Sequence, residues 1–405
     1  MVIIMHYVRK VTDDLYWVGA NDRRLALFEN IHPLPRGISY NSYLLLDGKT
    51  VLFDTADWAV CRQFLENVEH VLAGRKLDYL VVNHVEPDHS AALEEIVLRW
   101  PEVKIIGTAK AFAFLRQFGA PVDGREDPVK EGDTRCFGRH TVTFLAAPMV
   151  HWPEVMVTFD TTNGVLFSAD AFGSFASLDG RLFNDEVDYD RDWLGEARRY
   201  YANIVGKYGP QVQALLKKVS KYDVKMICPL HGLVWRADLG YYLGKYDLWS
   251  RYEPEKKGVL IVYGSMYGHT ESAADALAGK LTERGVGEVA MFDVSSTHVS
   301  CLIAESFRLS HIVLASVTYN LGIYPPMLGY LNDMKALNLQ NRTFAVLENG
   351  TWACMSGTLM SDFVTKELKN CRLLDGRMSL RSAMKPEQEG DLDRFADAIA
   401  ESVKN

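Results

Sequence analysis

One stretch of eight residues, Asn83-His84-Val85-Glu86-Pro87-Asp88-His89-Ser90, limits most strongly what this chain can fold into. It follows the apolar run from 77 to 82, which is typical of a strand buried in a mixed or parallel sheet. Within six positions it carries four side chains that can bind a metal ion: His84, Glu86, Asp88 and His89. The stretch therefore predicts a metal site at the end of a buried strand.

The conformation of this stretch decides whether those side chains can act together. In an extended segment alternate side chains share a face, so His84, Glu86 and Asp88 can point the same way, whereas a helix would scatter them. Pro87 favours the extended form because it disfavours the helical conformation of the residue before it. The alternative is a polar turn in which Asp88 or Ser90 caps the next helix, but a cap needs one acceptor and no histidines.

Three further polar residues each follow an apolar segment in the same way. His151 follows the strand predicted at 141–145, Asp170 the strand at 164–168, and His231 the strand at 224–228. Any one such histidine is more often an ordinary core residue. Four strand ends that deliver histidine or carboxylate indicate a shared metal site, because ligands in sheets flanked by helices gather at the carboxyl ends of strands.

Composition excludes several classes of protein. A chain of 405 residues suggests two or three domains, and a net charge of −8 without a basic run argues against nucleic-acid binding. No apolar run reaches the roughly 18 residues that span a bilayer, and the N-terminus lacks the features of a secretion signal. We therefore expect neither a nucleic-acid partner nor a membrane partner.

The cysteines point to the compartment. Six cysteines are scattered without a Cys-x-x-Cys pair, which excludes a rubredoxin-type iron site or a zinc ribbon within this chain. Scattered free thiols are typical of the reducing cytoplasm, and pairing of some of them is the alternative.

The pattern of strands and helices changes near residue 252. Residues 1–252 begin with strands in hairpins and continue with strands interleaved with helices, which predicts two sheets packed between helices. A charged segment with Pro and Gly, 250–258, is the expected linker. Residues 253–405 alternate strand and helix regularly, with strands at 259–263, 289–292, 311–315 and 343–347, so we expect a doubly wound parallel sheet of the α/β class.

Three loops of this second domain are candidates for a ligand site. The first joins strand to helix, and its hydroxyls and backbone N–H groups can enclose a phosphate; it comprises Ser265, Met266, Tyr267, Gly268, His269 and Thr270. It contains no Lys or Arg, unlike a nucleotide-triphosphate loop, which favours a monoester phosphate held by hydrogen bonds. A capped turn without a ligand is the alternative.

The other two loops follow later strands. One comprises Val317, Thr318, Tyr319, Asn320 and Gly322, and the other Asn349, Gly350, Thr351, Trp352 and Ala353. Trp352 can stack on a flat ring, with ordinary packing as the alternative. All three loops lie at carboxyl ends of predicted strands, where this architecture binds ligands.

These residues carry a family resemblance over nearly the whole chain. The set His84-x-Glu86-x-Asp88-His89, with His151, Asp170 and His231, resembles the metal set of the metallo-β-lactamase-like superfamily, and Glu in place of its second histidine is what flavodiiron proteins carry. The resemblance implies an N-terminal αββα metallo-β-lactamase-like domain (1–252) and a flavodoxin-like domain (253–405).

The resemblance also implies cofactors. One iron would be held by His84, Glu86 and His151 and the other by Asp88, His89 and His231, with Asp170 as the bridge, although the equivalent of His89 is not a ligand in every member. The three loops resemble the FMN-binding loops of flavodoxins, with two departures: Val317 replaces a frequent proline, and the third loop reads Asn-Gly-Thr-Trp.

The charges agree with iron independently of the family. Glu86, Asp88 and Asp170 contribute −3 against +4 from two ferrous ions, and replacing an imidazole with the harder carboxylate of Glu86 stabilises the ferric state. A zinc hydrolase with a flavodoxin-like passenger domain is the first alternative. A flavin electron carrier whose metal domain is only a scaffold is the second.

We therefore expect a cytoplasmic oxidoreductase that reduces dioxygen to water, nitric oxide to nitrous oxide, or both. The resemblance implies that electrons pass through FMN from an external donor, which is a rubredoxin, another reduced flavoprotein or coenzyme F420. It also implies a head-to-tail homodimer or a dimer of such dimers. Tyr200 and Tyr201 are candidates to offer a hydroxyl beside the metal site, and ordinary helix packing is an alternative at least as strong for either.

Overall fold

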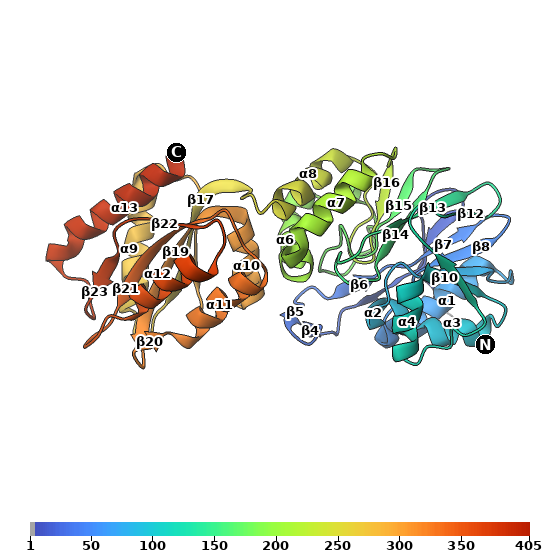
Figure 1. Cartoon of the computed structure of the whole chain (residues 1–405), viewed down its shortest axis with the longest axis horizontal. Helices are drawn as coiled ribbons and strands as arrows, with labels where there is room; N and C mark the ends of the chain where they lie inside the picture. The colour runs from blue at the N-terminus through green and yellow to red at the C-terminus, as the bar shows by residue number, and fades with distance from the viewer. Residues whose placement is uncertain (1–4) are drawn as a thin grey trace. The chain divides into compact units, whose positions relative to one another are not determined.

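The computed structural model describes residues 5–405 and divides them into two compact units (Figure 1). The first unit contains the residues up to 201 together with 210–246, and the second contains 202–209 and 247–405. Each unit has its own sheets and is described by itself. The boundary between residues 252 and 253 stays a prediction.

The first unit contains two large sheets. The first sheet has the strand order β1-β2-β7-β8-β9-β10-β11. Its strands are β1 (Arg9–Lys10), β2 (Leu15–Trp17), β7 (Tyr43–Leu46), β8 (Thr50–Phe53), β9 (Tyr79–Val81), β10 (Lys104–Thr108) and β11 (Glu126–Val129). From β1 to β8 neighbours run antiparallel, and from β8 to β11 they run parallel. The change occurs where hairpins give way to helical crossovers, which parallel strands require.

The second sheet has the order β12-β13-β14-β15-β16. Its strands are β12 (Thr134–Cys136), β13 (Thr141–Ala146), β14 (Met156–Asp160), β15 (Val165–Phe167) and β16 (Met226–Cys228). Apolar side chains of both sheets form one core, in which the Phe53 and Phe167 rings stack at 3.8 Å. Short pairs β3 (Ala20–Asp22) with β6 (Ile38–Tyr40), and β4 (Leu27–Phe28) with β5 (His32–Pro33), complete the strands of this unit.

Helices flank the two sheets (Figure 1). They are α1 (Cys61–Leu72), α3 (Leu93–Arg99), α4 (Ala109–Gln117), α5 (Tyr189–Asp192), α6 (Leu194–Tyr200), α7 (Gly209–Val219) and α8 (Leu239–Ser250). The first residue of α7 and the last turn of α8, 247–250, fall in the second unit. In α1, Phe64, Leu65, Val68 and Leu72 are buried at helical spacing, so one face of the helix packs inward. Two sheets between helices confirm the predicted αββα architecture.

The stretch from 83 to 90 differs from the expectation in one respect. The chain is extended at Glu86, with φ −55° and ψ 141°, but Pro87–Ser90 forms a short helix, α2. Proline is well suited to the first turn of a helix, because its missing N–H would have no intrahelical partner there. The extended form thus ends at Glu86, and Asp88 groups with His89 and His231 rather than with His84 and Glu86.

The second unit is a doubly wound parallel sheet with the order β18-β17-β19-β21-β22. Its strands are β17 (Lys256–Gly264), β18 (Val289–Asp293), β19 (Leu309–Tyr319), β21 (Thr343–Asn349) and β22 (Arg372–Leu373), with β20 (Gly322–Ile323) on β19 and β23 (Met378–Leu380) on β21. The helices are α9 (His269–Glu283), α10 (Val299–Arg308), α11 (Pro325–Ala336), α12 (Ser356–Glu367) and α13 (Glu389–Lys404). The order reverses between β17 and β19, which is the flavodoxin-like switch point where ligands bind.

A buried arginine forms hydrogen bonds with the segment at the start of this unit. The guanidinium of Arg342 is 1% exposed and donates hydrogen bonds to the carbonyls of Tyr252, Ser306 and Phe307 at 2.6–2.9 Å. Tyr252 lies in the segment predicted to be the linker. Arg342 therefore ties that segment to the body of the second unit.

Across residues 5–405, the structure contains no helix with both the length and the apolarity needed to cross a bilayer.

Candidate functional site

The structure brings all seven predicted metal-binding side chains of the first unit together, in two groups. In each group the potential ligand atoms lie within 4.8 Å of one another. One group contains His84, Glu86, His151 and Asp170, and the other contains Asp88, His89 and His231. This is the grouping that the family resemblance implies.

Asp170 lies between the two groups and presents one oxygen to each. Its Oδ2 is 3.1 Å from His151 Nε2 and 3.6 Å from His84 Nε2. Its Oδ1 is 3.1 Å from His89 Nε2 and 3.7 Å from His231 Nε2. A carboxylate with one oxygen toward each group has the arrangement of a bridging ligand.

The distances between potential ligand atoms within each group are those expected when the atoms bind one cation. Glu86 Oε2 lies 3.1 Å from both His84 Nε2 and His151 Nε2. Asp88 Oδ2 lies 3.2 Å from His89 Nε2 and 3.3 Å from His231 Nε2. Two donors bound to one ion at about 2.0–2.2 Å lie about 3.0–3.4 Å apart, so these spacings suit metal ligation.

Unpartnered polar atoms support the same reading. Within residues 5–405, neither carboxylate oxygen of the largely buried Asp88 has a hydrogen-bond partner. The Nε2 atoms of His89 and His231 face each other at 3.1 Å. Buried acceptors without donors are costly, and a cation between these groups removes the cost. The residues present therefore fit a pair of metal ions.

The crowding of carboxylates leads to the same conclusion. Burial raises the pKa of the Asp88 carboxyl to about 7, and repulsion from Glu86 and Asp170 adds to this effect, while His89 opposes it. Burial also opposes ionisation of Asp170, but the histidines His89, His151 and His84 hold its pKa well below the usual range. Two divalent cations would let all three carboxylates stay ionised.

Asp54 at the end of β8 holds the loop that carries the first ligands. Its Oδ1 accepts hydrogen bonds from the backbone N–H of Asn83 at 2.7 Å and of His84 at 3.2 Å. Its Oδ2 accepts from the Asn83 side chain at 2.7 Å. Burial raises the pKa of Asp54 to about 6, and the bonds from Asn83 and the charge of His89 limit this rise. A strand end thus fixes the backbone from which His84 projects.

The outer nitrogens of two histidines contact different groups. His84 Nδ1 lies 2.7 Å from Glu154 Oε1, while His231 Nδ1 lies 2.7 Å from the Ser39 carbonyl oxygen. Burial lowers the pKa of His84, but its bonds to Glu154 and Glu86 outweigh this and raise it well above the ordinary value. Burial lowers the pKa of His231, and Asp170 and Ser39 only partly oppose it. Sequence reasoning missed Glu154, although a lone acidic residue just before a buried strand was a usable signal.

The two predicted tyrosines occupy different surroundings. The Tyr200 hydroxyl is buried and has no hydrogen-bond partner within residues 5–405, and its ring lies 5.5 Å from that of His231. Burial and the charges of Asp170 and Asp88 raise the pKa of Tyr200 well above its usual value. Tyr201 packs edge-on against Tyr246 at 4.9 Å. Of the two, Tyr200 is the one beside the metal cluster.

In the second unit the three predicted loops converge on a cavity of about 330 Å³. The lining residues that the sequence predicted are Ser265, Met266, Tyr267, His269, Thr270, Val317, Thr318, Asn349, Gly350, Thr351 and Trp352. Gly268, Tyr319, Asn320, Gly322 and Ala353 are not among the lining residues, and their roles stay predictions.

The first loop has the features of a phosphate cradle. Gly268 has φ +89°, and a Cβ there would meet no atom within 4 Å, so the space beside it is open. The 15-residue helix α9 begins at His269, directly after this glycine. The first N–H groups of a helix lack intrahelical acceptors and favour an anion. A phosphate therefore fits at this loop.

The rim of the cavity offers surfaces for a flat ring. Trp352 is 79% exposed and Tyr267 is 88% exposed. Single exposed aromatic side chains are common, but two that line the same cavity offer it a shared apolar surface. A planar aromatic group bound between the loops would cover them.

One lining residue, Ser382, was not predicted. It follows the three-residue strand β23, and its backbone N–H and carbonyl bond the Asn349 side chain at 3.0 and 2.8 Å. Asn349 also donates to Thr270 Oγ1 at 3.2 Å, so it connects separate loops. The rule that ligands bind at carboxyl ends of strands points to Ser382, but β23 is too short to identify from sequence.

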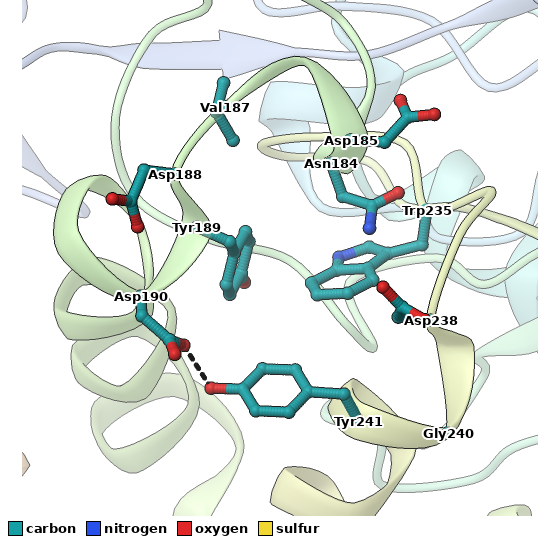
Figure 2. Close-up of a pocket in the computed structure, with 10 residues that line it drawn as sticks. All are labelled: Asn184, Asp185, Val187, Asp188, Tyr189, Asp190, Trp235, Asp238, Gly240 and Tyr241. Carbon is teal, nitrogen blue, oxygen red and sulfur yellow. Dashed lines mark hydrogen bonds between the residues drawn. The ribbon is translucent and has the colours of Figure 1, made fainter.

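A different hollow in the first unit, about 580 Å³ in volume, is aromatic and acidic (Figure 2). Trp235 lines it, stacked at 4.3 Å on Tyr242. Of its four aspartates, Asp190 accepts a hydrogen bond from Tyr241 (Figure 2) and Asp185 pairs with Arg236 at 3.0 Å. The hollow shares no residue with the metal cluster.

Fold and site together define a protein that joins a metallo-β-lactamase-like metal domain to a flavodoxin-like domain. Residues 38–232 match the family model described as ODP family beta lactamase, and residues 261–370 match that of flavodoxin. Both matches lie where the structure places the metal cluster and the loop cavity.

Known relatives resemble the chain over most of its length. It is 34% identical over 347 residues to the anaerobic nitric oxide reductase flavorubredoxin of Aeromonas hydrophila, which covers 84% of this chain and 70% of that protein. It is 33% identical to the nitric oxide reductase of Moorella thermoacetica, over 82% of this chain and 83% of that protein. The rubredoxin oxygen:oxidoreductase structure from Desulfovibrio gigas superposes with a TM-score of 0.91 at 29% identity, covering 98% of this chain and 99% of that one. The chain belongs to the flavodiiron protein family of oxidoreductases.

Proposed function

We propose that this chain reduces nitric oxide to nitrous oxide, and dioxygen to water, at a diiron site, with electrons that reach the site through FMN. The observation that carries the proposal is Asp170, whose two oxygens face two groups of buried histidines and carboxylates. The relatives named nitric oxide reductase and the D. gigas structure named rubredoxin oxygen:oxidoreductase support the choice of substrates.

The metal positions follow from the two groups. His84, Glu86 and His151 would hold one iron, Asp88, His89 and His231 would hold the other, and Asp170 would offer one oxygen to each. When bound, the iron pair supplies the electrons for substrate reduction. Glu86 adds a negative charge where a zinc hydrolase of this superfamily has a neutral imidazole, and hard anionic donors favour iron in its oxidised state.

Protein groups around the metals bind substrate and handle protons. Reduction of two nitric oxides consumes two electrons and two protons, and reduction of dioxygen to two waters consumes four of each. The Tyr200 hydroxyl has no hydrogen-bond partner among residues 5–405, so it can donate a hydrogen bond to a polar substrate atom. Its buried position keeps it protonated, which is the form that can donate.

FMN is proposed for the loop cavity of the second unit. The neutral loop from Ser265 to Thr270 and the start of α9 hold the phosphate, and Trp352 and Tyr267 cover the ring. When bound, FMN passes electrons singly or in pairs between donor and metal. The external donor is a rubredoxin, another reduced flavoprotein or coenzyme F420.

The assembly is proposed to be a head-to-tail homodimer, or a dimer of such dimers, in which the FMN of one chain serves the irons of its partner. The proposal follows from the family resemblance. A hybrid of two inactive variants, one without FMN and one without iron, tests it, because only that arrangement restores activity in the mixed dimer. Six free cysteines within residues 5–405 support a cytoplasmic location.

Protein purified without air and reduced fully tests the main proposal. We expect about two irons and one FMN per chain, fast reoxidation by a pulse of nitric oxide or of dioxygen, and nitrous oxide or water as the product. Two zincs with hydrolysis of a lactone or thioester would identify a hydrolase instead. Iron and FMN present, with no reoxidation by either gas, would leave only an electron carrier.

A further inference from the structure

The histidines of the two metal positions contact different groups through the ring nitrogen that faces away from the metal. Behind His84, at 2.7 Å from its Nδ1, lies the carboxylate of Glu154. Behind His231, at the same distance, lies the neutral carbonyl of Ser39. His89 Nδ1 has no hydrogen-bond partner within residues 5–405. The anionic contact is therefore made on one side of the cluster.

Glu154 is placed to act on His84 and on little else. Both side chains are completely buried. Its Oε1 accepts from His84 and from the backbone N–H of Val85 at 3.1 Å, and its Oε2 has no hydrogen-bond partner within residues 5–405. No Lys or Arg of the described chain forms an ion pair with it. Its charge is thus not neutralised by a basic side chain, and it is directed at one imidazole.

A carboxylate behind a ligating histidine has two effects. It fixes the tautomer, so that Nδ1 carries the proton and Nε2 faces the metal. It also makes the imidazole a stronger donor, because the negative charge draws the Nδ1 proton away. Stronger donation stabilises the more highly charged ion. The metal position that includes His84 as a ligand therefore favours ferric iron more than the position that includes His231.

The carboxylates around the two positions also favour ferric iron at the position with His84. The position with His84 has Glu86 as a direct ligand and Glu154 behind it, whereas the position with His231 has Asp88 alone. Asp170 contributes one oxygen to each. Among carboxylates that offer an oxygen to a metal position or contact the ring of one of its histidines from behind, the first position thus has one more than the second.

We propose that Glu154 is a positioning residue that makes the two irons unequal, so that the iron held by His84, Glu86 and His151 is oxidised first. The inference rests on the proposed diiron function. In the one-electron step, one ferrous ion becomes ferric and the electron passes to the nitric oxide or dioxygen that is reduced. The iron held by Asp88, His89 and His231 stays ferrous through that step.

The test is a redox titration of the iron-loaded, FMN-loaded protein, followed by electron paramagnetic resonance, for wild type, Glu154→Gln and Glu154→Asp. Gln keeps the shape and an acceptor for His84 but loses the charge. We expect Glu154→Gln to bind two irons. At the iron that is oxidised first, the equilibrium between ferric and ferrous should shift at least tenfold toward ferrous, which raises the reduction potential by about 59 mV for one electron. The second couple shifts less, and Glu154→Asp, which keeps the charge, stays closer to wild type.

Asp160→Asn is the matched control. Asp160 is also a buried carboxylate bonded to a histidine, at 2.8 Å from His140 Nδ1, but it lies at the far end of β14 from Glu154. It should leave both potentials unchanged. This control separates the loss of a specific charge from a general loss of stability.

Several results would overturn the inference. They are unchanged potentials in Glu154→Gln with two irons bound, an equal shift of both couples, or a shift in Glu154→Asp as large as in Glu154→Gln. If Glu154→Gln binds fewer than two irons per chain, Glu154→Asp decides: wild-type iron content and potentials in Glu154→Asp support a role of the charge, and equal loss of iron in Glu154→Asp refutes it. Failure of the proposed function shows separately, as wild-type protein that contains no iron pair.

Discussion

His140 provides a sharp test of how buried charge stabilises the first unit. It lies between β12 and β13, with Nδ1 2.8 Å from Asp160 Oδ2 and Nε2 3.0 Å from Asp14 Oδ2. Its side chain is 2% exposed. The bond to Asp160 and, against the effect of burial, the bond and charge of Asp14 raise its pKa to about 9. The doubly paired imidazole is therefore charged at neutral pH.

The raised pKa of His140 stabilises the folded protein at low pH more than at high pH. In the unfolded chain the pKa returns to about 6.5. A group whose pKa is higher in the folded state stabilises fully below the unfolded pKa, and this contribution disappears as the pH rises through the folded pKa. A rise from 6.5 to about 9 is worth about 3 kcal/mol, and the loss falls between about pH 6.5 and 9.

The assay compares wild type with His140→Gln in urea unfolding at pH 6 and pH 10, at fixed iron and FMN concentrations because bound ligands shift apparent stability. Titrating groups that do not contact His140 are common to both proteins and cancel in the difference. We expect the advantage of wild type to shrink by about 3 kcal/mol between the two pH values. An advantage that stays constant, or grows with pH, would refute the reasoning.

Four further predictions concern the two sites and the buried arginine. Tyr200→Phe should keep two irons and the stability of wild type, because the hydroxyl loses no hydrogen bond to the described part of the chain, but should slow gas reduction at least tenfold in stopped-flow assays. Asp170→Asn should lower iron content below two per chain in metal analysis, because the amide cannot serve as an anionic bridge. Trp352→Ala should weaken FMN binding by roughly tenfold, measured from FMN fluorescence on release. Arg342→Met should lower the free energy of unfolding of the second unit by about 3 kcal/mol, measured as earlier FMN release on heating, because buried carbonyls lose their donors.

Local pattern was enough to predict most of the metal cluster. Residues such as His84, His151 and His231 are recognisable because each lone polar side chain follows an apolar run, and strand ends gather at one edge of a sheet. The helical turn at Pro87 was missed, although proline at the first helical position is a known signal. The extended geometry was assumed to continue through it.

Other features depend on contacts between distant segments, which local pattern does not report. The short strands β3 and β6 exist because residues 20–22 pair with residues 38–40. Glu154 has its role only because His84, 70 residues earlier, folds onto it. Ser382 reaches the loop cavity through a three-residue strand that carries almost no signal of its own.

The shared backbone of the two metal positions has a consequence for how the site fills. Asp88 and His89 follow Glu86 within three residues, and Asp170 serves both groups, so binding at either position restrains the donors of the other. Binding of the first ion thus orders most of the side chains that the second ion needs, so the second ion binds with a smaller loss of conformational entropy. We expect metal uptake to be cooperative, so that at limiting iron the population consists of empty and doubly filled chains, with few that hold a single ion.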